Sequence, residues 1–320
     1  TYYFSPVWFY CLGIIGTAED TLYAYLYDES MSKKGANNVV LCVVYHVITF
    51  ILKNYQYREN IYELNIIMDN CGGQNENGTV LKMASYFVER GWFRSVNLIF
   101  LVKGHTKNQC DCMFNLLKVH WHKSNVYTFE QALEVLDSVE NVHLIDASDI
   151  HVDYSSVFDD FYKQPEPGTI QKNHIFNFHT STIHDCIMTT KRSSNAVVTS
   201  TQTIKKPKSK WSKHVQDLKL IRPTLPFMPK IGLKPIKQVY LYTKWRAVMP
   251  HPYKDVLCPL PSNKIIQLVL KRKGTPSDEQ QDEMSPEYLA IPAADKVVNE
   301  CPRKEDTCVR TPRRKTRKRK

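Results

Sequence analysis

Two polar clusters in the N-terminal half contain the side chains best suited to chemistry. The first follows the apolar segment 62–68, and the second follows the apolar segment 96–102. Polar residues after the C-terminal ends of neighbouring strands meet at one edge of an α/β sheet, where active sites are found. The candidate site residues are Asp69, Asn70, Gln74 and Asn75 from the first cluster, and His105, Lys107, Asp111, Asn115 and Lys118 from the second cluster and the helix after it.

Asp69 and Asp111 are the carboxylates in these clusters that can bind a hard metal ion. Mg²⁺ and Mn²⁺ prefer oxygen ligands, and an aspartate at a strand end can converge with another on a nearby helix. Two-metal phosphoryl transfer needs several carboxylates, which hold two ions about 3.5 to 4 Å apart. The alternatives are a turn or cap for Asp69 and a solvated helix carboxylate for Asp111.

The neighbouring polar residues have two readings each. His105 would orient the attacking water or contact the phosphate, or it would only cap the helix start. Asn70, Gln74 and Asn75 would contact a nucleic-acid backbone, or hold turns and caps. A zinc site is a weaker hypothesis, because the C-x-C and H-x-H spacings match no common structural site. The residues of that hypothesis are Cys110, Cys112, His105, His120 and His122.

The elements that position these residues alternate between strands and helices. Capping boxes at Thr106-x-x-Gln109 and Thr128-x-x-Gln131 predict two helix starts. The order of elements in residues 1–150 indicates an α/β fold with a mixed sheet flanked by helices. The expected strands are 7–15, 22–27, 62–68, 96–102 and 142–145, and the expected helices are 34–54, 77–90, 106 to about 121, and one that begins at 128.

Composition excludes several classes of protein. The 320 residues are 42% hydrophobic, which is enough for a core and rules out a wholly disordered chain. The longest apolar run, 39–52, is shorter than the roughly 20 residues that cross a bilayer, so we expect no membrane partner. Nine scattered cysteines, an odd number, indicate reduced thiols rather than a disulfide framework.

Positive charge is concentrated in the C-terminal half, within a net charge of +11. Residues 196–274 contain many lysines, prolines and aromatic residues, which predicts a basic, Pro-rich accessory region with short strands that binds nucleic acid. The alternative is that its strands are ordinary and that its lysines only keep them soluble. Residues 275–320 are expected to be a disordered spacer and a basic tail. The tail, which includes Arg313, Arg314 and Lys315, indicates nuclear localisation or phosphate binding.

Three sequence elements together carry a resemblance to a known family. They are Asp69-Asn70-Cys71-Gly72-Gly73-Gln74-Asn75-x-Asn77, Gly104-His105-Thr106-Lys107-Asn108-x-x-Asp111, and the upstream Lys33-Lys34-Gly35-Ala36-Asn37. Over residues 1–183 the chain resembles an uncharacterised transposase-like domain family of transposon-derived reading frames in animals and oomycetes. The resemblance implies an RNase H-like, DDE-type core for residues 1–150, extended by 151–195, that binds two Mg²⁺ or Mn²⁺ ions. Asp69 and Asp111 would be its second and third metal carboxylates.

The family's first acidic residue lies on a strand that would precede Thr1, so we expect an N-terminally truncated core. The leading hypothesis is a metal-dependent polynucleotidyl transferase or nuclease with DNA as partner and with His105 assisting. The alternative is a catalytically inert nucleic-acid-binding remnant of a transposase. The sequence leaves open whether the chain forms a homo-oligomer.

Overall fold

A three-stranded mixed sheet forms the first part of the fold. The computed structural model describes residues 7–17, 19–53, 63–71, 75–102, 108–181, 186–207, 225 and 227–272. In spatial order the strands of the first sheet are β1 (Phe9–Ile15), β2 (Leu22–Asp28) and β5 (Val142–Asp146). β2 pairs antiparallel with β1 and parallel with β5. The hairpin predicted from residues 7–27 and the strand predicted from 142–145 are therefore confirmed.

A five-stranded sheet forms the second part. Its strands, in spatial order, are β3 (Glu63–Met68), β4 (Ser95–Phe100), β6 (Ile175–Thr180), β7 (Cys186–Lys191) and β8 (Ser200–Gln202). β3 and β4 are parallel, and the other neighbouring pairs are antiparallel. The predicted α/β class with a mixed sheet flanked by helices is confirmed, but the strands are divided between two sheets. The segment 151–195, expected to extend the core, supplies β6 and β7.

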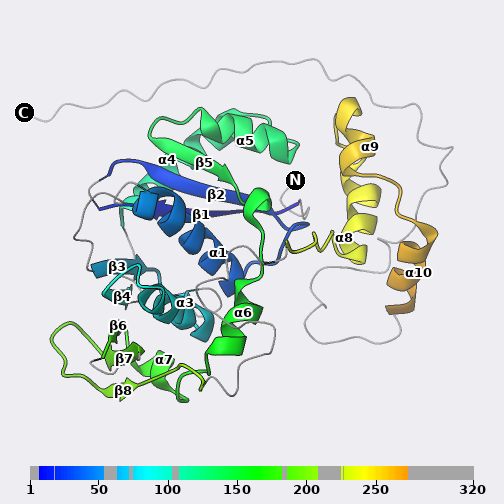
Figure 1. Ribbon diagram of the computed structural model, residues 1–320. Coiled ribbons are helices and arrows are strands. Elements are labelled where there is room, and N and C mark those ends of the chain that lie inside the picture. Colours follow the sequence, from blue (N-terminus) through cyan, green and yellow to red (C-terminus); the bar gives the residue numbers. More distant parts are fainter. Residues whose placement is uncertain are drawn as a thin grey trace, which may run out of the picture.

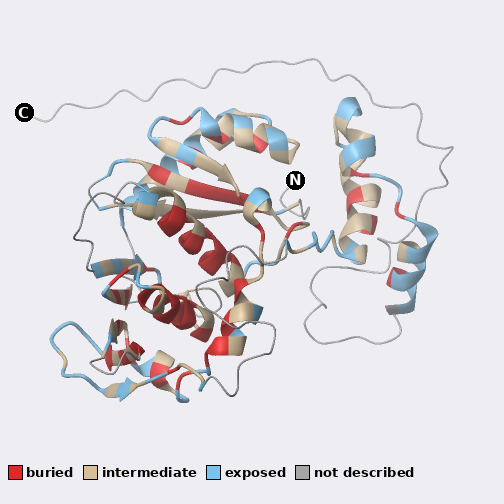
Figure 2. Ribbon diagram, viewed as in Figure 1, coloured by how far each residue is buried: buried red, intermediate tan, exposed pale blue. Residues whose placement is uncertain are grey.

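Helices cover both faces of the first sheet and one face of the second. α4 and α5 pack on one face of β2, while α1 packs on the other and also contacts α3 and α6 beside the second sheet. Buried residues are concentrated in β2, α1 and α3 (Figure 2). The helices are α1 (Ala36–His46, continued by a π-helix, Val47–Leu52), α3 (Gly78–Glu89), α4 (Gln109–Lys123), α5 (Phe129–Asp137), α6 (Tyr154–Phe161) and the short α7 (Thr169–Lys172).

Alternation along β2 explains how this strand is buried on both faces. Leu22, Ala24 and Leu26 pack against α4 and α5, whereas Tyr25 and Tyr27 pack on the side of α1. Successive side chains of a strand point to opposite faces, so the run of apolar and aromatic residues fills two layers at once.

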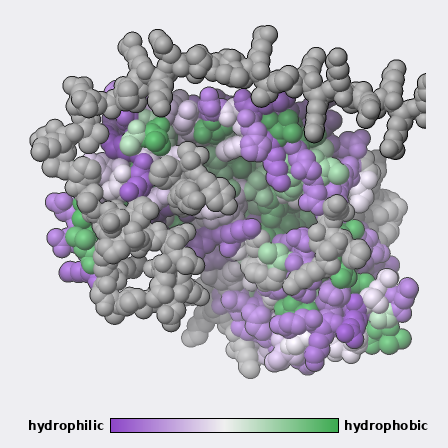
Figure 3. Space-filling model, turned by 180° about the vertical axis from the view of Figure 1, so that it is seen from behind, coloured by the Kyte–Doolittle hydropathy of each residue, from purple (hydrophilic) through white to green (hydrophobic). Residues whose placement is uncertain are grey.

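From behind, hydrophobic surface gathers near the centre of the molecule and hydrophilic surface dominates the lower part (Figure 3).

Local signals set several helix ends as predicted. The Thr128 hydroxyl accepts from Gln131 N at 3.2 Å while Gln131 Oε1 accepts from Thr128 N at 3.3 Å, which completes the expected capping box of α5. Gly91, with φ of 71°, follows α3 in the left-handed conformation that ends helices.

The C-terminal arm, residues 227–272, is helical, so the prediction of a β-rich accessory region was wrong for this part. Its elements are α8 (Pro235–Tyr240), a π-helix (Leu241–Trp245), a 3₁₀ turn (His251–Tyr253), α9 (Lys254–Leu257) and α10 (Asn263–Arg272). The prediction rested on the prolines, which disfavour helix interiors. Pro235, however, occupies the first turn of α8, where no backbone donor is needed. In the part of the chain that the structure describes, no helix is long and apolar enough to cross a membrane.

The arm lies beside the α/β core (Figure 1) and contacts it at three places. At its start, Phe227 forms an antiparallel bridge with Val152, and Met228 N donates to His151 O at 2.9 Å. Gly232 N donates to Ser30 O at 2.7 Å, and Lys237 forms an ion pair with Glu29 at 3.0 Å. Farther along, the hydroxyl of Tyr253 accepts from Gln131 Nε2 at 2.7 Å. These contacts fix the arm against the segment before α6, the β2–α1 connection and α5.

Candidate functional site

Asp69 lies at the sheet edge where the sequence predicted chemistry. β3 and β4 are parallel neighbours, and Leu101 N donates to Met68 O at 2.9 Å immediately after their paired ends. Asp69 is exposed, and its carboxylate forms no hydrogen bond or ion pair with any other described residue. It is therefore available to a cation or to a donor from a ligand.

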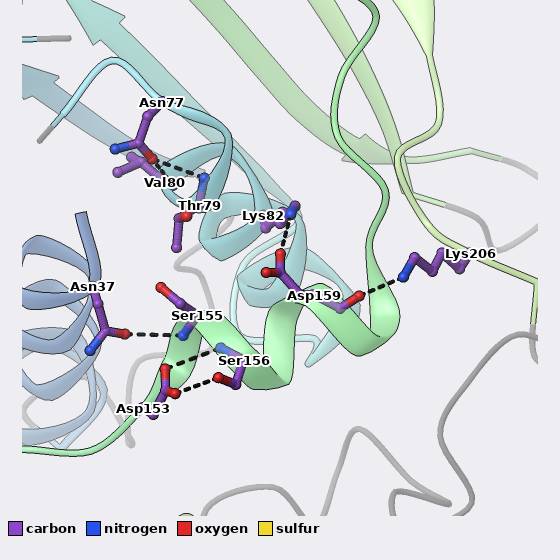
Figure 4. Close-up of polar contacts among 10 residues, drawn as sticks. All are labelled: Asn37, Asn77, Thr79, Val80, Lys82, Asp153, Ser155, Ser156, Asp159 and Lys206. Atoms are coloured by element: carbon purple, nitrogen blue, oxygen red, sulfur yellow. Dashed lines mark hydrogen bonds and ion pairs between the residues drawn. The ribbon is translucent and has the colours of Figure 1, made fainter. Parts of the chain in front are cut away.

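The amides around Asp69 hold the loop and start the next helix. Asn75 Nδ2 donates to the Asp69 carbonyl at 3.0 Å, which closes the loop after β3. Asn77 Oδ1 accepts from Thr79 N at 2.9 Å and Val80 N at 3.2 Å as the N-cap of α3 (Figure 4). Asn70 is half-buried, and Gln74 lies outside the described residues. Asn75 thus makes a turn contact, which is one of the two roles predicted for it.

Asp111 is in the first turn of α4, where it completes a capping box with Asn108. Asn108 Oδ1 accepts from Asp111 N at 3.1 Å, and Asp111 Oδ2 accepts from Asn108 N at 3.2 Å. α4 starts two residues later than the predicted box of Thr106 and Gln109 implied, with Asn108 as its N-cap, and Thr106 lies outside the described residues. Asn is at least as good an N-cap as Thr, and an aspartate in the first turn interacts favourably with the helix dipole.

α4 packs on the first sheet although it follows a strand of the second. A Cβ on Gly13 of β1 would lie 2.8 Å from the Phe114 ring of α4, so that these elements approach as closely as glycine allows. Gln109 Nε2 also lies 3.4 Å from Asp20 Oδ1, at the tip of the β1–β2 hairpin. Asp69 and Asp111 are thus held by elements of different sheets.

Some of the remaining predicted site residues are exposed, and the others lie outside the described residues. Asn115 and Lys118 are exposed on α4, where a large ligand can reach them. Three groups lie outside the described residues, namely His105 with Lys107, Gln74, and the tail residues Arg313, Arg314 and Lys315. Among the described residues, no group of three or more His, Cys, Asp or Glu side chains could hold a metal ion. The described carboxylates therefore do not by themselves fit a two-ion site.

A hydrogen-bonded row of polar side chains, which was not predicted from the sequence, lies on the exposed face of the second sheet. Asn97 lies opposite Asn65 on one side and Asn177 on the other. Asn97 Nδ2 donates to Asn65 Oδ1 at 2.7 Å and to Glu63 Oε1 at 2.5 Å, and Asn177 Nδ2 donates to Asn97 Oδ1 at 2.6 Å. The period-two polar residues of β3 were a signal for an exposed face, but their partners lie on strands distant in sequence.

The third sequence element also has a structural role. Asn37, on α1, accepts from Ser155 N at 3.0 Å and donates to Val152 O at 3.2 Å, which positions the start of α6 (Figure 4). Two elements of the motif set, around Asn37 and Asn77, thus set the starts of helices that pack together in one core.

One known protein family matches most of the α/β core. The model of the family described as "Domain of unknown function (DUF7869)" matches residues 5–196, more than half of the chain. The chain belongs to the DUF7869 family. The matched residues include both candidate aspartates and every strand except β8, whereas the C-terminal arm lies outside the DUF7869 match. No curated protein and no solved structure matched the chain.

Proposed function

We propose that this DUF7869 domain derives from a transposase and is an RNase H-like, metal-dependent nuclease or polynucleotidyl transferase that acts on DNA. One observation carries the proposal. Among the described residues, β1 pairs only with β2 and β3 only with β4, so each is an edge strand of its sheet. Leu12 and Ile14 of β1 pack against the same core cluster as Leu64 and Ile66 of β3.

Because β1 and β3 are both edge strands and pack on the same core, one additional strand could pair with both of them. A strand antiparallel to β1 and parallel to β3 would join the sheets in the order β5-β2-β1, new strand, β3-β4-β6-β7-β8. In an RNase H-like core this central strand carries the first acidic residue, next to the strand that ends at Asp69. The proposal requires that residue, because Asp69 and Asp111 alone do not suffice for two Mg²⁺ or Mn²⁺ ions.

DNA is the proposed partner because positive and polar side chains accompany the aspartates. Lys118 and Asn115 are exposed on α4 next to Asp111, and the chain has a net charge of +11. Cations of this kind contact phosphates without reading sequence. The basic tail supports a nuclear location for the protein.

A second candidate function, an inert DNA-binding remnant, is favoured by one specific contact. The Asp111 carboxylate caps α4, so folding alone accounts for an aspartate at this position. On this proposal, the domain retains fold and charge and binds DNA without cleaving it.

Metal-dependent nicking of labelled duplex DNA distinguishes these functions. The native-length protein would be compared with Asp69→Asn and Asp111→Asn, and with Asp137→Asn as a control for an exposed carboxylate at the end of α5. Cleavage with Mg²⁺ or Mn²⁺ that is lost in the first two variants and kept in the third supports the enzyme. Salt-sensitive binding without cleavage, unchanged in all three variants, contradicts the enzyme and supports the remnant.

A further inference from the structure

The C-terminal arm exposes an unusual share of the chain's large apolar side chains. Of the fifteen large hydrophobic residues that are exposed in the described part of the chain, eight belong to the 46 residues of the arm. Exposed apolar groups that gather in one region mark interaction surfaces. These residues are Phe227, Ile231, Ile236, Val248, Val256, Leu260, Leu268 and Leu270.

One of these residues, Val256, lines a cleft between α8 and the turn after α9. The cleft has a volume of about 200 Å³. Val256, on its wall, is 73% exposed, so the wall is accessible from solvent. The lining residues are Leu233, Gln238, Leu241, Val256, Leu257 and Pro259.

The arm around the cleft is strongly basic. Residues 227–272 contain nine Lys and Arg residues and one acidic residue, Asp255. The carboxylate of Asp255 is already bound by Arg246 at 2.6 Å, and this contact lowers the pKa of Asp255. Lys254 and Lys234 flank the lining residues in sequence. The surface therefore favours an occupant that combines acidic with apolar side chains.

A segment of the same chain has this chemistry. Residues 277–300 contain seven acidic residues and one lysine, and within them Met284, Tyr288, Leu289 and Ile291 are apolar. Met284 is twelve positions beyond Arg272, the end of α10, and twelve residue steps span up to about 40 Å. α10 packs directly on α8, so the cleft is within this reach.

We propose that residues 277–300 bind the cleft of the C-terminal arm of their own chain. Met284, Tyr288, Leu289 and Ile291 would pack against the apolar lining, and the acidic residues between Asp278 and Glu287 would face the lysines of the arm. This contact covers Val256 and the other apolar residues of the cleft lining and neutralises part of the arm's charge. It does not depend on the proposed nuclease function.

Hydrogen exchange followed by mass spectrometry on the full chain tests the contact. Amides in 284–291 should exchange at least about tenfold more slowly than in an unprotected chain, which corresponds to a bound population of nine in ten or more. Val256→Glu should remove this protection. Val248→Glu, also exposed on the arm but outside the cleft lining, should leave the protection in place.

A second variant does not alter the folded arm. Asp282→Asn combined with Glu283→Gln and Glu287→Gln changes only the segment, and should release 284–291 in the same way. Equal exchange of 284–291 in the native chain, Val256→Glu and the triple variant would overturn the proposal. Protection that rises with protein concentration would also overturn it, because the occupant would then be a second copy. So would protection of the arm that appears only when duplex DNA is added.

Discussion

The ammonium nitrogen of Lys82 lies 2.5 Å from a carboxylate oxygen of Asp159 and thereby ties α3 to α6 (Figure 4). Only 1% of the lysine side chain is exposed, against 62% of the aspartate side chain. The carbonyl of Asp159 also accepts from Lys206 Nζ at 2.5 Å. Asp159, at the surface, thus neutralises the ammonium group of Lys82, whose side chain is buried in the core.

Removing the two partners should have unequal effects on stability. Asp159→Ala leaves the buried ammonium without its partner and should lower the free energy of unfolding by about 1–3 kcal/mol. Lys82→Met keeps the apolar packing and removes the charge, so its loss should be smaller. Urea unfolding measures both variants. A loss in Lys82→Met as large as that in Asp159→Ala would contradict this account.

Stability should fall in mild acid because of a buried histidine. Burial lowers the pKa of His46 to about 4, and its Nδ1 shares a hydrogen bond with the Tyr25 hydroxyl at 3.2 Å. As pH falls below about 6.5, the unfolded chain binds a proton at this residue that the folded chain excludes until about pH 4. The full penalty is about 3 kcal/mol, reached below pH 4.

His46→Gln should therefore narrow the difference in unfolding free energy between pH 7 and pH 4.5. His122→Gln, at an exposed position on α4, is the control and should leave that difference unchanged. Denaturant unfolding at several pH values between 7 and 4 gives the comparison. Parallel curves for native protein and His46→Gln would exclude His46 as a source of acid sensitivity.

A methyl group at Gly13 should destabilise the protein, because side chains around it would have to shift. The added Cβ would lie 2.8 Å from the Phe114 ring and 2.9 Å from a methyl of Leu22, so Gly13→Ala should cost about 1–3 kcal/mol. Phe114→Leu in the same chain should recover part of this loss, which a double-mutant cycle measures. Strictly additive effects would show that the ring is not what excludes the methyl.

The two candidate aspartates should differ in their effect on folding. Asp111→Ala removes half of the α4 capping box and should lower the free energy of unfolding by about 0.5–1 kcal/mol. Asp69→Ala removes an exposed carboxylate with no described partner, and its change should stay within about 0.5 kcal/mol. Thermal unfolding of the two variants makes the comparison, and equal losses would contradict the capping role of Asp111.

Local sequence patterns predicted the helices and strands of the core. They did not predict which distant strands pair with one another. The caps at Thr128 and Gly91 and the apolar run of β2 depend on neighbours along the chain, so sequence could reveal them. The division into two sheets depends on which distant strands pair, and the row of Asn65, Asn97 and Asn177 depends on the same register. Asp69 was placed correctly at its strand end, while the capping role of Asp111 depended on a helix start two residues later than predicted.

The pairing of β2 with β5 has a consequence for synthesis on the ribosome. Leu22 and its partner Val142 are 120 positions apart, and the whole β3–α3–β4 unit lies between them in sequence. The β1–β2 hairpin therefore emerges long before its third strand, and the edge of β2 that pairs with β5 stays unpaired while other elements form. Pairing between strands so distant in sequence slows folding, and it prolongs the exposure of an unpaired strand edge that can aggregate. Nascent chains of this protein should accordingly depend on chaperones until residue 146 has left the exit tunnel.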